Sequence, residues 1–383
     1  MSIDEPLRMD NVKPLAPDAD GGSTAAYPGY RAEQVHDEAE HRDLRVVLRA
    51  DAGRTQGTGH VMRLLTLAEA LRERGHHAIL ASAEIDVPWL FDAVSASGVE
   101  VVAAPRDEID VDGLLALRPD WVVVDSYLVP AASIDALDPR VPVLLLADGD
   151  ARGADATLYL DQNLGAAPLA GVGEERQLRG AHFALVRAAI RNEVRTDAAS
   201  VRHDPPHVLV VLGGTDPDDR TVDVARACAA LAWHAAFTFV APSRQHAALD
   251  GLGPGRTSWQ IHAPTPQLPG LLGDADVIVS AGGTSAWDVG TLGTPSVLLA
   301  LVANQQASLA AAVDAGVALG FDVVDAPRDL PMVAEAVEVL LTDAALRSRV
   351  VASCRATFDG MGGRRVVEAV ERHPRTRVAG GRP

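Results

Sequence analysis

The chain has 383 residues and a formal net charge of −18 at pH 7, and 48% of its residues are hydrophobic. This length suits about two domains, and the negative charge disfavours nonspecific binding to nucleic acid or to anionic membranes. Lys13 is the only lysine and Cys228 and Cys354 are the only cysteines, which excludes a Schiff-base lysine, a P-loop, a disulfide framework and a CxxC zinc site from the predicted folded part.

The N-terminal 43 residues differ from the rest of the chain in composition. Residues 1–43 contain Pro, Gly, Asp and Glu without periodicity, which predicts a disordered N-terminal extension. Acidic residues near the start and the lack of an apolar core argue against a signal peptide, and no stretch of about 18 residues is apolar enough to span a membrane. The few cysteines suit a reducing compartment, so we expect a cytoplasmic protein.

Strands and helices alternate in the first half of the folded part. The expected strands are 44–50, 78–82, 99–103, 121–124, 143–147 and 157–160, and the expected helices are 61–74, 87–97 and 110–117. Gly75 and Gly98 follow two of these helices as C-caps. The uncharged runs 122–124 and 143–146 suit central strands, and the alternation indicates a parallel sheet covered on both faces.

The second half repeats this pattern after a polar stretch near 191–206. Its expected strands are 207–212, 236–240, 277–280 and 296–301, and its expected helices are 221–232, 286–292 and 306–315. A last helix, at 331–341 or 345–373, is expected to pack back across the cleft. We therefore predict an α/β protein of two Rossmann-like, doubly wound domains, 44–200 and 201–373, with a flexible tail at 374–383.

Polar or glycine-rich loops follow many of these strands. They occupy residues 53–60, 125–127, 148–150, 161–163, 213–216, 281–285 and 302–305. Ligands of open parallel sheets bind beyond the carboxyl ends of the strands. The shared position of these loops therefore predicts a ligand-binding cleft.

Two glycine-rich loops in the second half connect a strand to a helix. Glycine lets the backbone approach a ligand closely, and a helix N-terminus offers free N–H groups and the positive end of the dipole. These features predict diphosphate binding; the alternative is a tight turn in which Thr or Ser caps the helix. The residues concerned are Gly213, Gly214, Thr215, Gly282, Gly283, Thr284 and Ser285.

Three further polar residues follow these loops. Asp288 lies about one turn into its helix and could hold the two hydroxyls of a ribose, or could form a capping box with Ser285. Asn304 and Gln305 can both donate and accept hydrogen bonds, as sugar hydroxyls require. The alternative for Asn304 is a helix cap.

The segment GRTQGTGHVMR, residues 53–63, places a histidine behind two glycines. Gly57 and Gly59 predict a loop that approaches the substrate closely. The dipole of the following helix favours a neutral His60, which can accept a proton near pH 7. His60 is therefore a candidate general base, although it could also cap or pack at a helix start. Arg63 is a candidate substrate-binding residue, unless it pairs with its neighbours on a solvated surface.

Acidic residues end three of the expected strands, at Asp125, Asp148 and Asp161. Each could orient or activate a nucleophile, or could cap a turn. We take Asp125 and its neighbour Tyr127 as candidate catalytic residues.

Seven segments, in order, resemble the UDP-sugar hydrolases of the pseudaminic acid pathway, which are related to spore-coat polysaccharide proteins and more distantly to MurG-type glycosyltransferases. The segments are RADAGRTQGTGHVMRLLTLAEAL, VVDSY, LYLDQNL, RGAHFALVRAAI, LVVLGGTDP, VIVSAGGTSAWDVGTLGTPSVLLALVANQ and FDGMGGRRVVEAV. The resemblance spans residues 45–370 and implies a GT-B fold, with the sugar in the N-terminal domain, UDP in the C-terminal domain, and no metal or other cofactor.

The resemblance also assigns roles to single residues. His60 matches the proposed catalytic base of these hydrolases, residues 282–285 match their diphosphate loop, and Asn304 and Gln305 match their sugar-side pair. Asp288 stands where they usually have a glutamate that holds the ribose, and Ser126 where they often have a histidine. The substrate they act on is UDP-2,4-diacetamido-2,4,6-trideoxy-β-L-altropyranose.

Three functions are compatible with these residues. The first is hydrolysis of a UDP-sugar to free sugar and UDP, with His60 activating water and inversion at the anomeric carbon. The second is an inverting glycosyltransferase of polysaccharide synthesis that uses the same base on a sugar hydroxyl, because fold cannot separate the two. The third is a catalytically inactive nucleotide-sugar-binding protein. We expect a monomer or weak dimer in each case.

Overall fold

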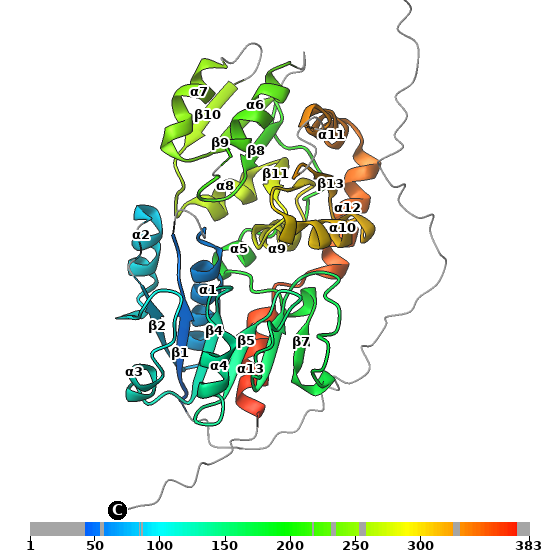
Figure 1. Ribbon diagram of the computed structural model, residues 1–383. Coiled ribbons are helices and arrows are strands. Elements are labelled where there is room, and N and C mark those ends of the chain that lie inside the picture. The colour runs from blue at the N-terminus through cyan, green and yellow to red at the C-terminus, as the bar shows by residue number, and fades with distance from the viewer. Residues whose placement is uncertain are drawn as a thin grey trace, which may run out of the picture.

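The computed structural model describes residues 43–373, except 54–56, 84, 86, 217, 231–234, 253–257 and 325–329. The expected N-terminal extension, apart from Asp43, and the expected tail at 374–383 lie outside the described residues. The described residues form two lobes, each built on one parallel sheet (Figure 1).

The N-terminal lobe contains a seven-stranded sheet in the order β3-β2-β1-β4-β5-β6-β7, with all neighbouring strands parallel. Its strands are β1 (Arg45–Ala50), β2 (His77–Ser82), β3 (Glu100–Ala103), β4 (Trp121–Asp125), β5 (Val143–Leu146), β6 (Leu158–Asp161) and β7 (Gln177–Arg179). Its helices in this part of the chain are α1 (Gly59–Glu73), α2 (Pro88–Ser97), α3 (Val111–Ala116) and α4 (Ala131–Leu137).

The C-terminal lobe contains a six-stranded parallel sheet in the order β10-β9-β8-β11-β12-β13. Its strands are β8 (His207–Val211), β9 (Ala236–Val240), β10 (Ser258–His262), β11 (Val277–Ala281), β12 (Ser296–Ala300) and β13 (Leu319–Asp322). The remaining α-helices are α5 (Ala188–Arg191), α6 (Arg220–Ala230), α7 (His246–Gly251), α8 (Leu268–Asp274), α9 (Ser285–Leu292), α10 (Gln306–Asp314), α11 (Leu330–Thr342), α12 (Ala344–Thr357) and α13 (Gly362–Arg372). The predicted pair of doubly wound domains is confirmed.

Apolar side chains on both faces of the first sheet explain its uncharged strands. Val123 and Leu144 pack on one face with α1, whereas Val122, Val124 and Leu145 pack in a separate cluster on the other face. Successive side chains of a strand point to opposite faces, so a strand covered on both faces needs an unbroken apolar run. The expected central strands are those with such runs.

Several short elements were not expected from the sequence. The edge strands β7, β10 and β13 and the short helices α4, α5, α7 and α8 are among them. Edge strands need no continuous apolar run, and β7 has three residues, of which two are polar. Such segments carry too weak a periodic signal to be recognised.

The C-terminal helices differ from the expectation in one respect. The expected helix at 345–373 is two helices, α12 and α13, because the chain turns between them at Gly360, which has a φ of 70°. That backbone conformation favours glycine.

Helix α13 returns to the N-terminal lobe, as expected for the last helix. Val366, Val367 and Val370 join the core cluster that contains α1 and β1, and α13 lies against α1 (Figure 1). At its start, a Cβ on Gly362 would lie 2.2 Å from the carbonyl oxygen of Ala184. The chain thus crosses between the lobes twice, and residues 362–372 pack with the first domain although the expected boundaries place them in the second.

The order of the strands reverses once in each sheet. In the first sheet the reversal lies between β1 and β4, and in the second between β8 and β11. Ligands of doubly wound sheets bind at this point, beyond the carboxyl ends of the strands. His60 lies in the first turn of α1, which follows β1, and Asp125 is the last residue of β4. The connections after β8 and β11 contain the two glycine-rich segments.

Candidate active site

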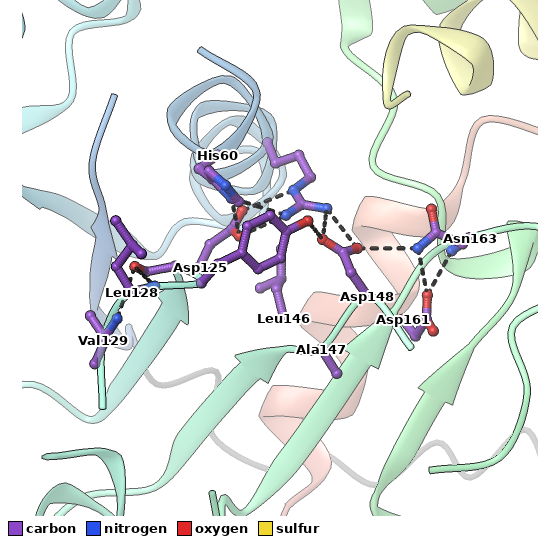
Figure 2. Close-up of polar contacts among 12 residues, drawn as sticks. His60, Asp125, Leu128, Val129, Leu146, Ala147, Asp148, Asp161 and Asn163 are labelled. Carbon is purple, nitrogen blue, oxygen red and sulfur yellow. Dashed lines mark hydrogen bonds and ion pairs between the residues drawn. The ribbon is translucent and has the colours of Figure 1, made fainter. Parts of the chain in front are cut away.

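A network of charged side chains lies at the carboxyl ends of β4, β5 and β6, beside the start of α1 (Figure 2). His60, in the first turn of α1, contacts Asp125 at the end of β4, with Nδ1 2.6 Å from Oδ1. Arg63, one turn further along the helix, donates from Nε and Nη2 to both oxygens of Asp125, at 2.9 and 2.6 Å. The helix spacing of three residues therefore directs both side chains to one carboxylate.

The charge on Asp125 is stabilised by its partners. Its side chain is 1% exposed, and this burial opposes ionisation, but Arg63 and His60 outweigh it and lower the pKa of Asp125 from 3.8 to about 2. An ionised carboxylate can only accept hydrogen bonds. We therefore assign the proton of neutral His60 to Nδ1, which leaves Nε2 as the proton acceptor.

Arg63 joins Asp125 to a second carboxylate. Its Nη1 donates to both oxygens of Asp148 at 2.8 Å. Tyr127 donates to Asp148 Oδ2 at 2.6 Å and packs edge-on against the His60 ring, with 4.6 Å between the ring centroids. Burial and the charge of Asp148 raise the pKa of Tyr127, so the phenol remains protonated and fixes the orientation of Asp148.

The network ends at β6. Asn163 donates from Nδ2 to Asp148 Oδ1 at 3.2 Å and to Asp161 Oδ1 at 2.9 Å. Ser126 Oγ accepts from the main-chain N–H groups of Leu128 and Val129 (Figure 2). Ser126 thus closes the turn after β4 rather than facing the charged side chains.

The surface pairing considered for Arg63 does not occur. Arg63 is 6% exposed and is engaged by Asp125 and Asp148. Its neighbours Arg49 and Asp51 form a separate buried ion pair at 2.7 Å. The alternative of a solvated surface cluster is therefore wrong, because all three side chains are buried and Arg63 pairs with Asp125 and Asp148 instead.

A cavity of about 370 Å³ lies between the two lobes, a size typical of small-molecule sites. The predicted residues that line it are Gly57, Gly59, Arg63, Gly213, Gly214, Thr215, Gly283, Thr284, Ser285, Asp288 and Gln305. The cavity thus brings together residues of both lobes from four separate segments of the chain, 57–63, 213–215, 283–288 and 305.

Five predicted residues lie outside the cavity wall: His60, Asp125, Tyr127, Gly282 and Asn304. Asp125, which also contacts His60, accepts a hydrogen bond from Arg63 of the wall. Tyr127 is connected to Arg63 through Asp148. The N–H of Gly282 donates to the carbonyl of Leu299 at 2.7 Å, so the wall of this loop starts at Gly283. Asn304 is exposed, whereas its neighbour Gln305 accepts from the N–H of Leu301 at 2.9 Å.

The lobes touch each other through glycines. A Cβ on Gly214 would lie 2.5 Å from the ring of Trp89 in α2 and 3.3 Å from Thr58 Oγ1. A Cβ on Gly59 would lie 3.9 Å from Thr284 Oγ1. Close contact at Gly214 therefore requires the absence of a side chain.

Two cavity arginines were missed by the sequence analysis, Arg187 and Arg220. Arg187 Nη2 donates to Asp288 Oδ2 at 2.6 Å; burial raises the pKa of Asp288, and Arg187 opposes this effect. The signal for Arg220 is its position at the start of α6, capped by Asp216, whose Oδ1 accepts the Arg220 N–H at 3.0 Å. Arg187 had no such local signal.

One group of side chains among the described residues has the spacing of metal ligands: His203, His207 and Asp274. It lies at the amino end of β8, on the edge opposite the cleft. None of the helices in the described part of the chain is long and apolar enough to cross a membrane.

No family model matches the chain. The chain is 21% identical over 294 residues to the spore coat polysaccharide biosynthesis protein SpsG of Bacillus subtilis, covering 72% of this chain and 83% of SpsG.

Three solved structures share the arrangement of both lobes. MurG of Acinetobacter baumannii superimposes with a TM-score of 0.64 at 16% identity, covering 86% of this chain and 100% of MurG. The calicheamicin glycosyltransferase CalG4 superimposes with a TM-score of 0.57 at 20% identity, covering 87% of this chain and 100% of CalG4. Staphylococcus aureus MnaA, solved with UDP, superimposes with a TM-score of 0.60 at 12% identity, covering 86% of this chain and 96% of MnaA. The chain therefore has the predicted GT-B fold.

Proposed function

We propose that this chain is a GT-B enzyme that transfers a sugar from a nucleoside diphosphate, with UDP as the first candidate, to a hydroxyl group in polysaccharide synthesis. The main observation behind this proposal is the His60–Asp125 pair, which lies beside a cavity whose other wall contains two glycine-rich loops. The similarity to SpsG, to a glycosyltransferase and to a protein solved with UDP supports this choice.

His60 would act as the general base. With Nδ1–H donating to ionised Asp125, Nε2 accepts the proton of the attacking hydroxyl while the oxygen forms its bond to the anomeric carbon. The developing imidazolium is stabilised by Asp125 at 2.6 Å. A positioned base of this kind typically contributes about 10²–10⁴-fold to the rate.

The C-terminal lobe would bind the leaving group. The N–H groups of Ala286 and Trp287 at the start of α9 already donate to the carbonyls of Gly283 and Thr284. The proposed main-chain donors are therefore those of the loop before α9, which lines the cavity together with Arg187 and Arg220. The bond from the anomeric carbon to the diphosphate oxygen breaks, and the diphosphate takes the electron pair. Main-chain donors and arginines stabilise the negative charge that develops there. One displacement inverts the anomeric centre.

The acceptor would enter on the side of β5. A second cavity, of about 530 Å³, begins at Gly149, directly after Asp148. Tyr127 and Leu128 present exposed apolar surface beside the network, with 43% and 53% of each residue accessible. A hydroxylated acceptor with an apolar face suits this combination.

Hydrolysis is the second candidate, favoured by the resemblance of the GTGHVMR and AGGTSAWD segments to the pseudaminic acid pathway hydrolases. In this reaction His60 takes the proton from water instead of from a hydroxyl group. Cleavage of a diacetamido-trideoxy sugar from UDP remains a prediction.

Product analysis with a panel of nucleotide sugars tests these candidates. NMR would follow each sugar nucleotide with and without hydroxylated acceptors. Turnover that depends on an acceptor supports transfer, whereas free sugar formed at an enzymatic rate without one would replace transfer by hydrolysis. Stabilisation of the protein against heat by UDP without turnover in either assay would overturn both and identify a binding protein.

A further inference from the structure

We propose that His203, His207 and Asp274 form a binding site for a divalent transition metal, with Zn²⁺ as the first candidate. His203 lies in the segment that enters the C-terminal lobe, His207 begins β8, and Asp274 ends α8. Their candidate ligand atoms all lie within 4.8 Å of one another. Two imidazoles and one carboxylate are donors that Zn²⁺ commonly takes in proteins.

Two separations between candidate ligand atoms are close to those around a tetrahedral ion, each involving a different oxygen of Asp274. His203 Nε2 lies 3.5 Å from Asp274 Oδ1, and His207 Nδ1 lies 3.5 Å from Asp274 Oδ2. Zinc ligands at about 2.0–2.2 Å from the metal are separated by about 3.3–3.6 Å in a tetrahedron. The side chains therefore need small shifts to surround an ion, with water as a fourth ligand.

Each histidine has a hydrogen-bond partner on its other ring nitrogen. His203 Nδ1 lies 2.9 Å from Asp276 Oδ2, and His207 Nε2 lies 2.9 Å from Thr238 Oγ1. Metal-binding histidines are usually oriented by such a partner, which accepts the ring N–H and leaves the other nitrogen as a donor to the metal. Asp276 is itself fixed, because it also accepts the main-chain N–H groups of Arg202 and His207.

One cation competes for this position. Arg202 Nη2 lies 3.7 Å from Asp274 Oδ1, but it is held by the main-chain carbonyls of Gly273 and Asp274 at 3.1 and 2.9 Å. Its contact with the carboxylate is therefore secondary, and an ion can approach because the Asp274 side chain is 57% exposed.

The bound ion would connect the interdomain segment to the second sheet. The site lies at the amino ends of β8 and β11, whereas the glycine-rich loops leave their carboxyl ends. It is thus separate from the proposed catalytic cleft. The expected effect of the metal is on the stability of the C-terminal lobe and not on sugar chemistry.

Calorimetric titration of the full chain with Zn²⁺ tests the proposal, using protein without a histidine tag after treatment with a chelator. We expect one equivalent to bind to the native chain and to the control variant His77→Ala, an exposed histidine on β2. Binding should be lost in His203→Ala/His207→Ala. Equal binding in that double variant, or no binding to the native chain, would overturn the site.

Further variants separate loss of a ligand from loss of the fold. Asp274→Asn changes an exposed side chain and should also abolish binding, with an unchanged circular dichroism spectrum. Thr238→Val should weaken Zn²⁺ binding about 10–100-fold, as expected for a residue that orients a ligand, and Arg202→Ala should strengthen it. Co²⁺ bound to the native chain should give the visible absorption of a tetrahedral complex; a spectrum insensitive to Asp274→Asn would contradict the assigned ligands.

Discussion

The two strand-order reversals of this protein provide two different kinds of site. At the reversal in the first sheet, His60, Arg63 and Asp125 form a charged network, on which the proposed catalysis depends. At the reversal in the second sheet, the cavity wall is formed by two loops that contain glycines, whose main chain can face a ligand closely. Under the proposed function, the same topology supports catalysis on one side and anion binding on the other.

His60→Ala should have the largest measured effect, and it tests whether the two reversals have these separate roles. If the first reversal supplies the base and the second binds the nucleotide, turnover should fall about 10²–10⁴-fold while UDP affinity, measured by calorimetry, stays unchanged. His77→Ala serves as the matched control because His77 is exposed. A variant that retains turnover would remove His60 from the mechanism, and a parallel loss of UDP affinity would contradict the division between the lobes.

The central strands and both glycine-rich loops were predictable because each depends on local sequence. Unbroken apolar runs indicated β4 and β5, and glycines directly after strands indicated the loops. The ion pairs were not predictable in this way. Arg63 and Asp148 are 85 positions apart, and Arg187 and Asp288 are 101 apart. Such pairs depend on which strands become neighbours, and that order is a property of the whole sheet.

The roles of single acids also depended on this long-range order. The sequence placed Asp125, Asp148 and Asp161 at strand ends, but it could not show that the first two share Arg63. It likewise could not show that Asp288, considered for ribose binding, contacts Arg187. Helix periodicity does not indicate that a guanidinium group from a distant part of the chain will lie beside this carboxylate.

Asp125→Asn should destabilise the N-terminal lobe. The change leaves the 6% exposed Arg63 with a weaker partner in a buried position, and breaking a buried ion pair typically costs about 3–5 kcal/mol. Urea unfolding at neutral pH measures this loss. Asp120→Asn is the control, since its carboxylate contacts the Arg45 N–H at an exposed position. Equal losses in the two variants would show that the Arg63 network does not stabilise the lobe.

Acid should remove part of this contribution from the native protein. The pKa of Asp125 is about 2 in the fold against an ordinary value of 3.8, so its stabilisation is present above about pH 4 and is lost as the pH falls through about 2. At about 1.4 kcal/mol per pH unit, this corresponds to about 2 kcal/mol. Urea unfolding of the native chain and Asp125→Asn at pH 4, 3 and 2 measures the difference.

The gap between the two unfolding free energies should shrink by that amount on acidification. Other acids titrate in both proteins, so their contributions cancel when the variant is subtracted from the native chain. A gap that stays constant from pH 4 to pH 2 would mean that Asp125 is not held in its ionised form by Arg63 and His60.

Gly214→Ala should have the smallest effect, and it tests the second reversal. The new Cβ would lie 2.5 Å from the Trp89 ring, so the lobes must separate or the ring must move. Overpacking of this kind typically costs about 1–3 kcal/mol. A cost of about 1.4 kcal/mol, in the lower part of that range, corresponds to about a tenfold loss of UDP affinity. Calorimetric titration with UDP measures it.

The cause of that loss can be isolated by a second substitution. Removing the opposing ring in Gly214→Ala/Trp89→Ala should restore part of the affinity, because the Cβ then has space. Gly270→Ala in α8 is the control, since a Cβ there meets nothing within 4 Å. If the double variant binds UDP no better than Gly214→Ala, the contact between the lobes does not control binding. The substitution must then disturb the main chain of the glycine-rich loop itself.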